Sequence, residues 1–228
     1  MKPLDSVAII VQARLNSQRV PQKMIRPFAG TTLFDIVLSK IKKALPLYQD
    51  NIWASVYETE LIDIARKNAV NVFSRSKTSA NNDNSLQTIY EWHNKLPYKY
   101  VILISGCNPL LKIKTIDAFV NQFVEQEEEN LFAVMKKKQY YWNKEGALIT
   151  PWPKDQTIMN TKAVEPTYEA AHVLYASRMD LIAQDRFMGD FVIPGGIKLF
   201  EKDELEAFDI DYEWQFETGE ILYEKFNK

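Results

Sequence analysis

Short apolar runs rich in valine and isoleucine alternate along this chain with segments whose apolar residues recur at helical spacing. The runs predict β-strands at Val7–Ala13, Ile52–Val56, Val70–Phe73, Tyr100–Ile104 and Leu131–Val134. The segments between them predict helices at Leu33–Ala44, Glu58–Asn68, Ser85–Lys95 and Thr115–Gln126. This alternation is typical of βαβ units, so we expect an α/β, Rossmann-like fold with a mostly parallel mixed sheet flanked by helices.

The alternation breaks down after about residue 135. Residues 137–165 combine prolines and aromatic residues without a clean period, which indicates an irregular arm or insertion that mediates dimerisation. Beyond it, we expect strands at His172–Ala176 and Ala207–Ile210, two strand pieces in "FVIPGGIKLF", and a closing helix at Glu213–Phe226. A chain of 228 residues without internal repeats is expected to form a single domain spanning 1–228.

Composition narrows the class of protein. The single Cys107 cannot form an internal disulfide and the N-terminus lacks a signal-peptide pattern, so we expect a cytoplasmic protein. No apolar run approaches the roughly 20 residues that span a bilayer, which argues against a membrane protein. A net charge of −2 argues against a nucleic-acid binder, because a basic face is needed to neutralise many phosphates.

The charges are unevenly distributed between the two ends of the chain. Residues 1–50 hold eight Lys/Arg and three Asp/Glu, a net of +5, whereas residues 201–228 hold three and ten, a net of −7. If the fold brings these ends together, a cationic loop faces a carboxylate cluster, which suits a metal-bound polyphosphate. Charges that solvate unrelated faces are the alternative.

The cations gather in "QARLNSQRVPQK", directly after the first predicted strand. The stretch contains no glycine, so it is neither a dinucleotide fingerprint nor a P-loop. Arg14 can fork onto phosphate oxygens, Lys23 can act as a point charge, and Asn16 and Ser17 can orient donors in a turn. Asn16 also accepts a left-handed conformation readily. A solvated basic loop is the alternative interpretation.

A pair of carboxylates forms the second candidate site. Asp209 and Asp211 are one residue apart on a predicted strand, so both point to the same face. Two such charges repel unless a cation lies beside them, and Mg²⁺ held by carboxylates and substrate phosphates is the usual solution. An acidic strand end, with Asp211 capping the next helix, is the alternative.

Three further features carry weaker signals. Cys107 has no histidine nearby in the sequence, so it is interpreted as a small buried residue and not as a nucleophile. His172 lies in an apolar strand and is interpreted as a hydrogen-bonded core histidine. Trp142 and Trp152 suit either stacking on a ligand or an oligomer contact.

The opening stretch resembles a known family, the cytidylyltransferases that make CMP-activated acidic sugars, such as the CMP-sialic acid and CMP-KDO synthetases and a spore-coat polysaccharide relative. Their opening motif is A-R-x-G-S-x-R-x-P-x-K followed by "pfxGxpL". Asn16 stands where the family has glycine. The residues that match are Ala13, Arg14, Ser17, Arg19, Pro21, Lys23, Phe28, Gly30 and Leu33.

The resemblance returns in order at three later places. Arg75, Asp83 and Ser85 match a family segment, with Ser76 in place of a proline. "CNPLL" parallels a strand-end turn, where Cys107 stands at the position of an aspartate that the KDO branch uses for metal. The "DID" of residues 209–211 parallels the C-terminal signature. The family's usual "NGaxYi" pattern is not evident in "YEAAHVLY".

The resemblance implies a nucleotidyltransferase that transfers CMP from CTP to an acidic sugar (nonulosonic acid-like) or related hydroxy acid and releases pyrophosphate. Arg14 and Lys23 would stabilise phosphate charge, and Mg²⁺ on Asp209 and Asp211 would activate the attacking hydroxyl. The nucleotide would contact Ala13, Arg14, Asn16, Ser17, Arg19, Lys23, Arg75, Asp83, Ser85, Ser105 and Asn108.

The acceptor would lie over Tyr168–Tyr175. We also expect a homodimer. The resemblance places the reaction in surface polysaccharide biosynthesis. A non-catalytic relative that binds nucleotide or protein is the alternative. A glycosyltransferase with a D-x-D pair is less consistent, because its pair normally follows a mid-chain strand.

Overall fold

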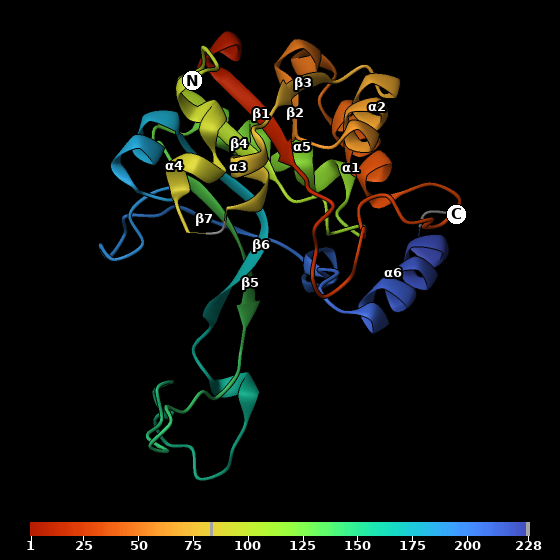
Figure 1. Cartoon of the computed structure of the whole chain (residues 1–228). Helices are drawn as coiled ribbons and strands as arrows, with labels where there is room; N and C mark the ends of the chain where they lie inside the picture. Colours follow the sequence, from red (N-terminus) through yellow and green to blue (C-terminus); the bar gives the residue numbers. More distant parts are fainter. Residues whose placement is uncertain (83, 227–228) are drawn as a thin grey trace.

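The computed structural model describes residues 1–82 and 84–226, and in this part of the chain a seven-stranded sheet forms the centre (Figure 1). The strands are β1 (Val7–Gln12), β2 (Ile52–Val56), β3 (Asn71–Ser74), β4 (Tyr100–Ile104), β5 (Leu131–Lys137), β6 (Thr167–Arg178) and β7 (Leu199–Glu201). Their order is β3-β2-β1-β4-β6-β5-β7. Only β6 runs antiparallel to its neighbours, which confirms the expected mostly parallel mixed sheet.

Helices cover both faces of the sheet. They are α1 (Leu33–Ala44), α2 (Thr59–Lys67), α3 (Lys77–Asn81), α4 (Leu86–Ile89), α5 (Ile113–Glu125) and α6 (Glu213–Phe226), with 3₁₀ helices η1 (Leu4–Ser6), η2 (Pro46–Asn51), η3 (Glu91–Asn94), η4 (Thr161–Ala163), η5 (Met179–Gln184) and η6 (Glu204–Ala207). Alternate residues of β1 enter two cores. Val7, Ile9 and Val11 pack with α1, α2 and α5, whereas Ala8 and Ile10 pack with η3 and η5.

Helix α1 illustrates how local sequence sets an element. Thr32 caps its N-terminus by accepting a hydrogen bond from the Asp35 amide, and Leu33, Val37 and Ile41 are buried on one face. The helix therefore has the bounds that its apolar spacing predicts. Strands β2 and β4 also begin and end where predicted.

Three predicted elements differ from the structure. The helix predicted at 85–95 breaks at Tyr90 (φ −106°, ψ 46°), because the chain turns there to bury Trp92 completely. Of the two strand pieces expected around the Pro-Gly-Gly turn, the second forms as β7 and the turn is present, with Gly195 at φ +75°, but residues 191–193 form bends and not a strand. Residues 207–210 are not a strand either: the Ile210 amide bonds to the Cys107 carbonyl, so this segment crosses the ends of the sheet strands.

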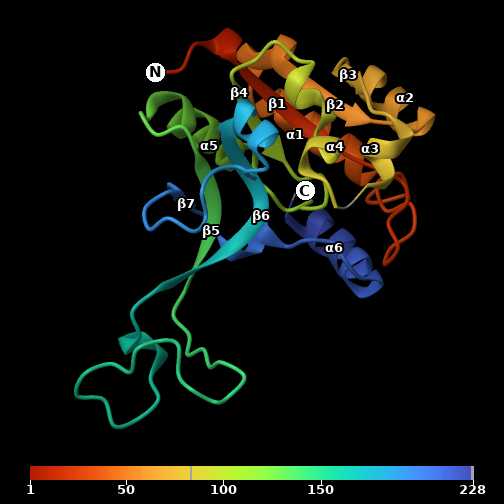
Figure 2. The same cartoon turned by 60° about the vertical axis from the view of Figure 1, so that its left-hand side comes forward.

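An arm leaves the body between β5 and β6. Strand β5 continues to Lys137 and β6 starts at Thr167, and residues 138–166 project away from the sheet in both views (Figures 1 and 2). Within the arm, a bridge pairs Trp142 with Leu148. Among the described helices, none combines the length and apolar character required to cross a membrane.

Candidate active site

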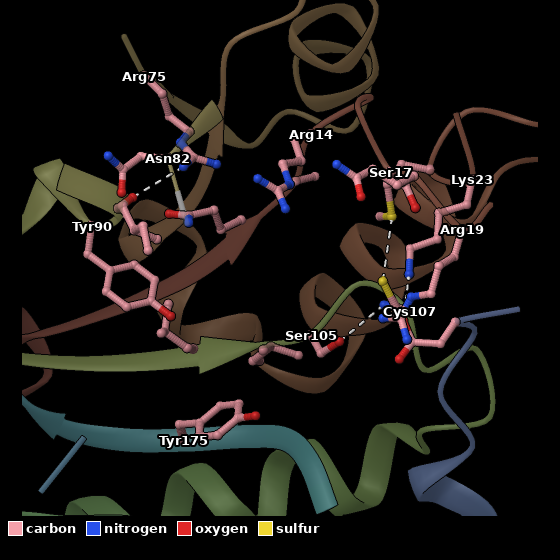
Figure 3. A pocket seen from close by; sticks show the side chains of 18 residues that line it. Arg14, Ser17, Arg19, Lys23, Arg75, Asn82, Tyr90, Ser105, Cys107 and Tyr175 are labelled. Carbon is pink, nitrogen blue, oxygen red and sulfur yellow. Dashed lines mark hydrogen bonds and ion pairs between the residues drawn. The ribbon is translucent and has the colours of Figure 1, made fainter. Parts of the chain in front are cut away.

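A cavity of about 590 Å³ opens at the carboxyl ends of β1 and β4, where parallel sheets of this type bind ligands (Figure 3). The loop after β1, the segment after β3, strand β6 and the segment before α6 all contribute to its wall. The described lining residues are Gln12, Ala13, Arg14, Ser17, Gln18, Arg19, Lys23, Met24, Arg75, Asn82, Ile89, Tyr90, Leu103, Ile104, Ser105, Cys107, Tyr175 and Asp211.

The two oppositely charged ends of the chain meet at this cavity. The Lys23 ammonium donates to the Ile210 carbonyl oxygen at 2.5 Å and lies 3.5 Å from the Asp211 carboxylate. Arg19 approaches the same carboxylate oxygen at 2.8 Å. The cationic loop and the acidic C-terminal segment therefore converge, which is the first of the two interpretations that the charge distribution allowed.

Lys23 is held as a charged group. Its side chain is only 12% exposed, and burial lowers its pKa, but contact with Cys107 and the charges of Asp209 and Asp211 more than offset this and raise the pKa above the ordinary lysine value. The ammonium consequently stays protonated at neutral pH. It is far more enclosed than Arg19, whose side chain is 54% exposed.

Asp209 and Asp211 lie in different environments although they are one residue apart. Asp211 lines the cavity, whereas Asp209 is half-buried and its buried Oδ1 has no hydrogen-bond partner. Burial and the neighbouring Asp211 charge raise the pKa of Asp209. At the start of α6 the Gln215 side-chain oxygen accepts from the Asp211 and Tyr212 amides, while the Asp211 carboxylate contacts Lys23 and Arg19.

The donor set suits a magnesium ion only if a ligand completes it. Among the described residues, no group of three or more His, Cys, Asp or Glu side chains could hold a metal alone. Asp209 nevertheless has a buried carboxylate oxygen without a hydrogen-bond partner, and Asp211 beside it lines the cavity. Mg²⁺ is usually bound in this way, by one or two carboxylates together with the phosphates of a substrate.

Arg75 lines the cavity on the side away from Asp211, and hydrogen bonds fix its guanidinium in place. Its guanidinium donates to the carbonyl oxygens of Ser79 at 2.6 Å and Ile89 at 3.2 Å, and to the Ser79 hydroxyl at 3.1 Å. Burial, followed by repulsion from Arg14, lowers its pKa to about 10. Arg75 is thus charged at neutral pH and joins Arg14 on the same side of the cavity.

The β1 loop is fastened to α3 by polar contacts. Arg14 donates to the Ala80 carbonyl oxygen at 3.4 Å, and the Asn16 amide donates to Asn81 at 2.6 Å. Asn16 does not use the left-handed conformation that its residue type tolerates; in this loop that conformation occurs at Gln22 (φ 54°), at the turn before Lys23.

The remaining predicted site residues divide between the cavity and its surroundings. Ala13, Ser17 and Ser105 line the cavity, and the Ser105 hydroxyl accepts from the Cys107 amide at 3.2 Å. Asn16 lies outside the lining, Ser85 caps α4, and buried Asn108 donates to the Ala207 carbonyl oxygen. Asp83 lies outside the described residues.

Two predictions for single residues need correction. Cys107 is only half-buried and lines the cavity, but burial raises the pKa of its thiol, so a thiolate nucleophile is not favoured. His172 is exposed and is not a core histidine. Its backbone is left-handed (φ 51°), which turns its side chain out of the strand.

The uncharged polar wall of the cavity was not predicted, apart from the Tyr168–Tyr175 segment that the family resemblance assigned to the acceptor. Gln12 is fixed by hydrogen bonds from the Trp92 indole at 3.0 Å and the Ser55 hydroxyl at 3.3 Å. Asn82, Tyr90 and Tyr175 also line the cavity. Among Gln12, Asn82 and Tyr90, only Gln12 could have been predicted from the sequence, because it is a polar residue that ends an apolar strand at the edge of the sheet where phosphates bind.

Comparison with known sequences identifies the family. The sequence model described as "Cytidylyltransferase" matches residues 8–226, almost the whole chain. The chain belongs to the cytidylyltransferase family. Similar curated proteins are N-acylneuraminate cytidylyltransferase B of Danio rerio, 28% identical over 137 residues, and the spore coat polysaccharide biosynthesis protein SpsF of Bacillus subtilis, 24% identical over 130 residues.

These alignments cover only part of each protein. They include 59% and 54% of this cytidylyltransferase, and the chain spans about a third (32%) and about half (52%) of the length of the two relatives. The confirmed family membership agrees with the resemblance seen in the opening motif.

Solved structures agree in fold. CMP:2-keto-3-deoxy-manno-octonic acid synthetase complexed with CTP superposes with a TM-score of 0.69 at 12% identity, covering 96% of this chain and 99% of that one. A cytidylyltransferase from Leptospira borgpetersenii gives a TM-score of 0.63 at 19% identity, covering 97% and 87%. At these identities the likeness establishes the nucleotidyltransferase fold alone.

Proposed function

We propose that this cytidylyltransferase transfers CMP from CTP to an acidic sugar of the nonulosonic acid type, or to a related hydroxy acid, and releases pyrophosphate. The observation that carries the proposal is the charge of the cavity. Four cations, Arg14, Arg19, Lys23 and Arg75, line a space of about 590 Å³. Among the described lining residues Asp211 is the only carboxylate, so the cavity suits a polyanion.

Each cation has a distinct place in the transfer. The acceptor hydroxyl attacks the α-phosphorus in line, the bond to the β-phosphate oxygen breaks, and pyrophosphate leaves. Lys23 is enclosed and charged, so it would stabilise the negative charge that builds on the phosphate oxygens. Arg19 is exposed at the rim and would hold the outer phosphates.

We propose Mg²⁺ as the cofactor, held by Asp211 and Asp209 together with the phosphates of CTP. When bound, the ion neutralises phosphate charge and lowers the pKa of the attacking hydroxyl. Asp211 would then exchange its contact with Arg19 for the ion, which leaves Arg19 available for phosphate. Pyrophosphate release should therefore stop in EDTA and recover when Mg²⁺ is added in excess.

We propose a homodimer formed through the arm. The arm carries exposed apolar side chains, among them Trp142, Trp152, Ile158 and Met159, that the body of the protein leaves uncovered. Light scattering should give twice the chain mass for the full-length protein. Replacing residues 139–165 with a short Gly-Ser turn should yield a monomer that keeps its sheet, and an unchanged mass would refute the arm as the interface.

The activity is tested by pyrophosphate release. The wild-type protein would be given each of the four nucleoside triphosphates with a panel of nonulosonic acids and Mg²⁺. We expect release with CTP only, and at least a 100-fold loss in Asp211→Asn, which removes the one described carboxylate of the cavity. Glu213→Gln is the matched control, because Glu213 is an acid two residues further along the chain that pairs with Arg26 and is not among the described lining residues.

A folded Asp211→Asn protein without activity supports the enzyme, whereas normal release from that variant refutes the assignment. Absence of release from the wild type with every triphosphate and acid would favour a non-catalytic relative that binds nucleotide or protein. The family relatives named for N-acylneuraminate and spore coat polysaccharide lead us to place the reaction in surface polysaccharide biosynthesis. We place it in the cytoplasm, in keeping with the single unpaired Cys107.

A further inference from the structure

The short helix α3 contacts the cationic side of the cavity through three consecutive residues. The carbonyl oxygens at the end of a helix are left without their usual partners within it, so they can accept bonds from elsewhere. The bonds that α3 accepts are from Arg75 to the Ser79 carbonyl oxygen at 2.6 Å, from Arg14 to the Ala80 carbonyl oxygen at 3.4 Å, and from the Asn16 side-chain amide to the Asn81 side-chain oxygen at 2.6 Å. The helix thus contacts both arginines that line this side of the cavity (Figure 3).

Helix α3 is itself attached to the body of the protein at both ends. Ser79 and Ala80 are buried, and the Ser79 hydroxyl donates to the Ile89 carbonyl oxygen at 3.1 Å. At the other end Ser76 caps the helix, and its amide and hydroxyl donate to the Glu91 carboxylate at 2.6 and 2.9 Å. The helix is therefore a fixed support against which the β1 loop can be positioned.

The side chain of Asn81 is oriented to receive the β1 loop. Its nitrogen donates to the Lys77 carbonyl oxygen at 2.8 Å, so its oxygen is the atom left to accept from Asn16. Both asparagines are exposed, and neither is among the described lining residues of the cavity. A single neutral hydrogen bond contributes only modestly to folding stability, so the main effect of this bond is on where the loop lies.

The bond acts beside a pair of like charges. Burial lowers the pKa of Arg75, and the nearby Arg14 charge lowers it further, which shows that the two guanidinium groups repel. Because Arg14 belongs to the β1 loop and Arg75 is bound to α3, this repulsion tends to separate the loop from the helix. Asn16 lies two residues after Arg14, and its bond to Asn81 opposes that separation.

We propose that Asn16 and Asn81 are positioning residues that hold the β1 loop against α3, so that Arg14 and Arg75 are already together when a polyphosphate arrives. This inference rests on the proposed function, and it makes Asn16 a support of the loop and not a contact of the nucleotide. A site that is ordered in advance binds its ligand more tightly, because less conformational freedom is lost on binding.

The test measures the binding of inorganic tripolyphosphate and of CTP to the full-length chain by isothermal titration calorimetry with Mg²⁺. Asn16→Ala and Asn81→Ala each remove the bond, and a third variant combines them. Thr78→Ala is the matched control, because Thr78 is exposed on the same helix, which meets the β1 loop through Ala80 and Asn81 instead. Arg14→Gln, alone and together with Asn81→Ala, tests whether the bond acts through Arg14.

We expect Asn16→Ala and Asn81→Ala each to raise the Kd of both ligands about three- to tenfold, the effect of losing one neutral hydrogen bond. The combined variant should bind like either single variant, because both changes remove the same bond. In the Arg14→Gln background, adding Asn81→Ala should change the Kd by less than twofold, a result that general loosening of α3 would not give. Thr78→Ala should bind like the wild type, and all variants should unfold at the wild-type temperature.

The inference is overturned if Asn16→Ala and Asn81→Ala bind tripolyphosphate within twofold of the wild type. It is equally overturned if Asn81→Ala weakens binding as much in the Arg14→Gln background as in the wild type. Pyrophosphate release from the same proteins separates these results from failure of the proposed function. Binding that depends on the two asparagines without release would refute the transfer reaction and support the pair, whereas a wild type that binds neither ligand would overturn both.

Discussion

Two cations share one carboxylate at the edge of the cavity, and replacing each in turn should separate structural from catalytic roles. Lys23→Met removes an ammonium that is 12% exposed and donates to the Ile210 carbonyl oxygen at 2.5 Å. A hydrogen bond from a charged donor contributes about 1.5–3 kcal/mol to stability. The loss is partly offset because no charge needs to be desolvated, so we expect the free energy of unfolding to fall by about 1–2 kcal/mol.

Arg19→Gln is the comparison. Arg19 contacts the same Asp211 oxygen at 2.8 Å, but its side chain is 54% exposed. Exposed ion pairs typically contribute less than about 1 kcal/mol. We therefore expect urea unfolding of this variant to match the wild type within about 0.5 kcal/mol, despite the shorter contact.

The same variants test the charge-stabilisation role. A donor aimed at developing charge in an enclosed site contributes about 100- to 1,000-fold to kcat. Lys23→Met should lose this much in the pyrophosphate-release assay, with intact secondary structure by circular dichroism. Because the pKa of Lys23 is raised, wild-type kcat should show no titration of this group between pH 7 and 9. A Lys23→Met enzyme with kcat within threefold of wild type would refute the reasoning.

Two further changes test the surrounding structure. Burial lowers the pKa values of Lys40 and Lys202 from 10.5 to about 8, so between pH 8 and 9.5 the unfolded chain binds more protons than the folded one, and stability should rise with pH. The free energy of unfolding should increase by about 1–2 kcal/mol for each lysine over this interval. Lys40→Met should remove about half of this dependence on pH, and an unchanged dependence would contradict the reasoning. Arg75 bonds the Ser79 hydroxyl through Nε and the carbonyl oxygens of Ser79 and Ile89 through one terminal nitrogen, and the single ammonium of Arg75→Lys cannot replace both nitrogens. The variant should cost about 1–3 kcal/mol of stability by urea unfolding, and a neutral result would show that the two-nitrogen contact is dispensable.

The apolar periodicity of the sequence was sufficient to predict the parallel half of the sheet. Helix α1 and strands β2 and β4 follow directly from spacing and capping, because each is buried on the faces that the pattern marks. Prediction failed at residues 207–210, where buried Ile210 gave the segment a strand-like pattern. The segment is held across the strand ends by the bond from the Ile210 amide to the Cys107 carbonyl oxygen, and by side-chain bonds from Asn108 and Lys23 to its carbonyl oxygens.

The charged part of the site was accessible from the sequence for a similar reason. Arg14, Arg19, Lys23 and Asp211 were marked by type and by position at the ends of elements, and all four line one cavity. The family resemblance placed the acceptor over Tyr168–Tyr175, but the sequence could not show that Tyr175 lines the cavity while His172 turns away, because their orientation depends on an irregularity of β6 that its pairing with β5 reveals. Asn108 and Ser85 were expected to contact the nucleotide, but their side chains bond to the protein itself: Asn108 donates to the Ala207 carbonyl oxygen and Ser85 caps α4. The sequence does not show which way these side chains turn.

The contact between Lys23 and Asp211 joins residues 188 positions apart, and this distance affects protein synthesis. A ribosome releases the N-terminal part of a chain first, and early elements begin to fold before later ones exist. The cationic loop emerges long before the carboxylate that faces it. A nascent chain that stalls before residue 211 can already contain most of the sheet and still lack its acidic counterpart, so the cavity is complete only after Asp211 has been synthesised.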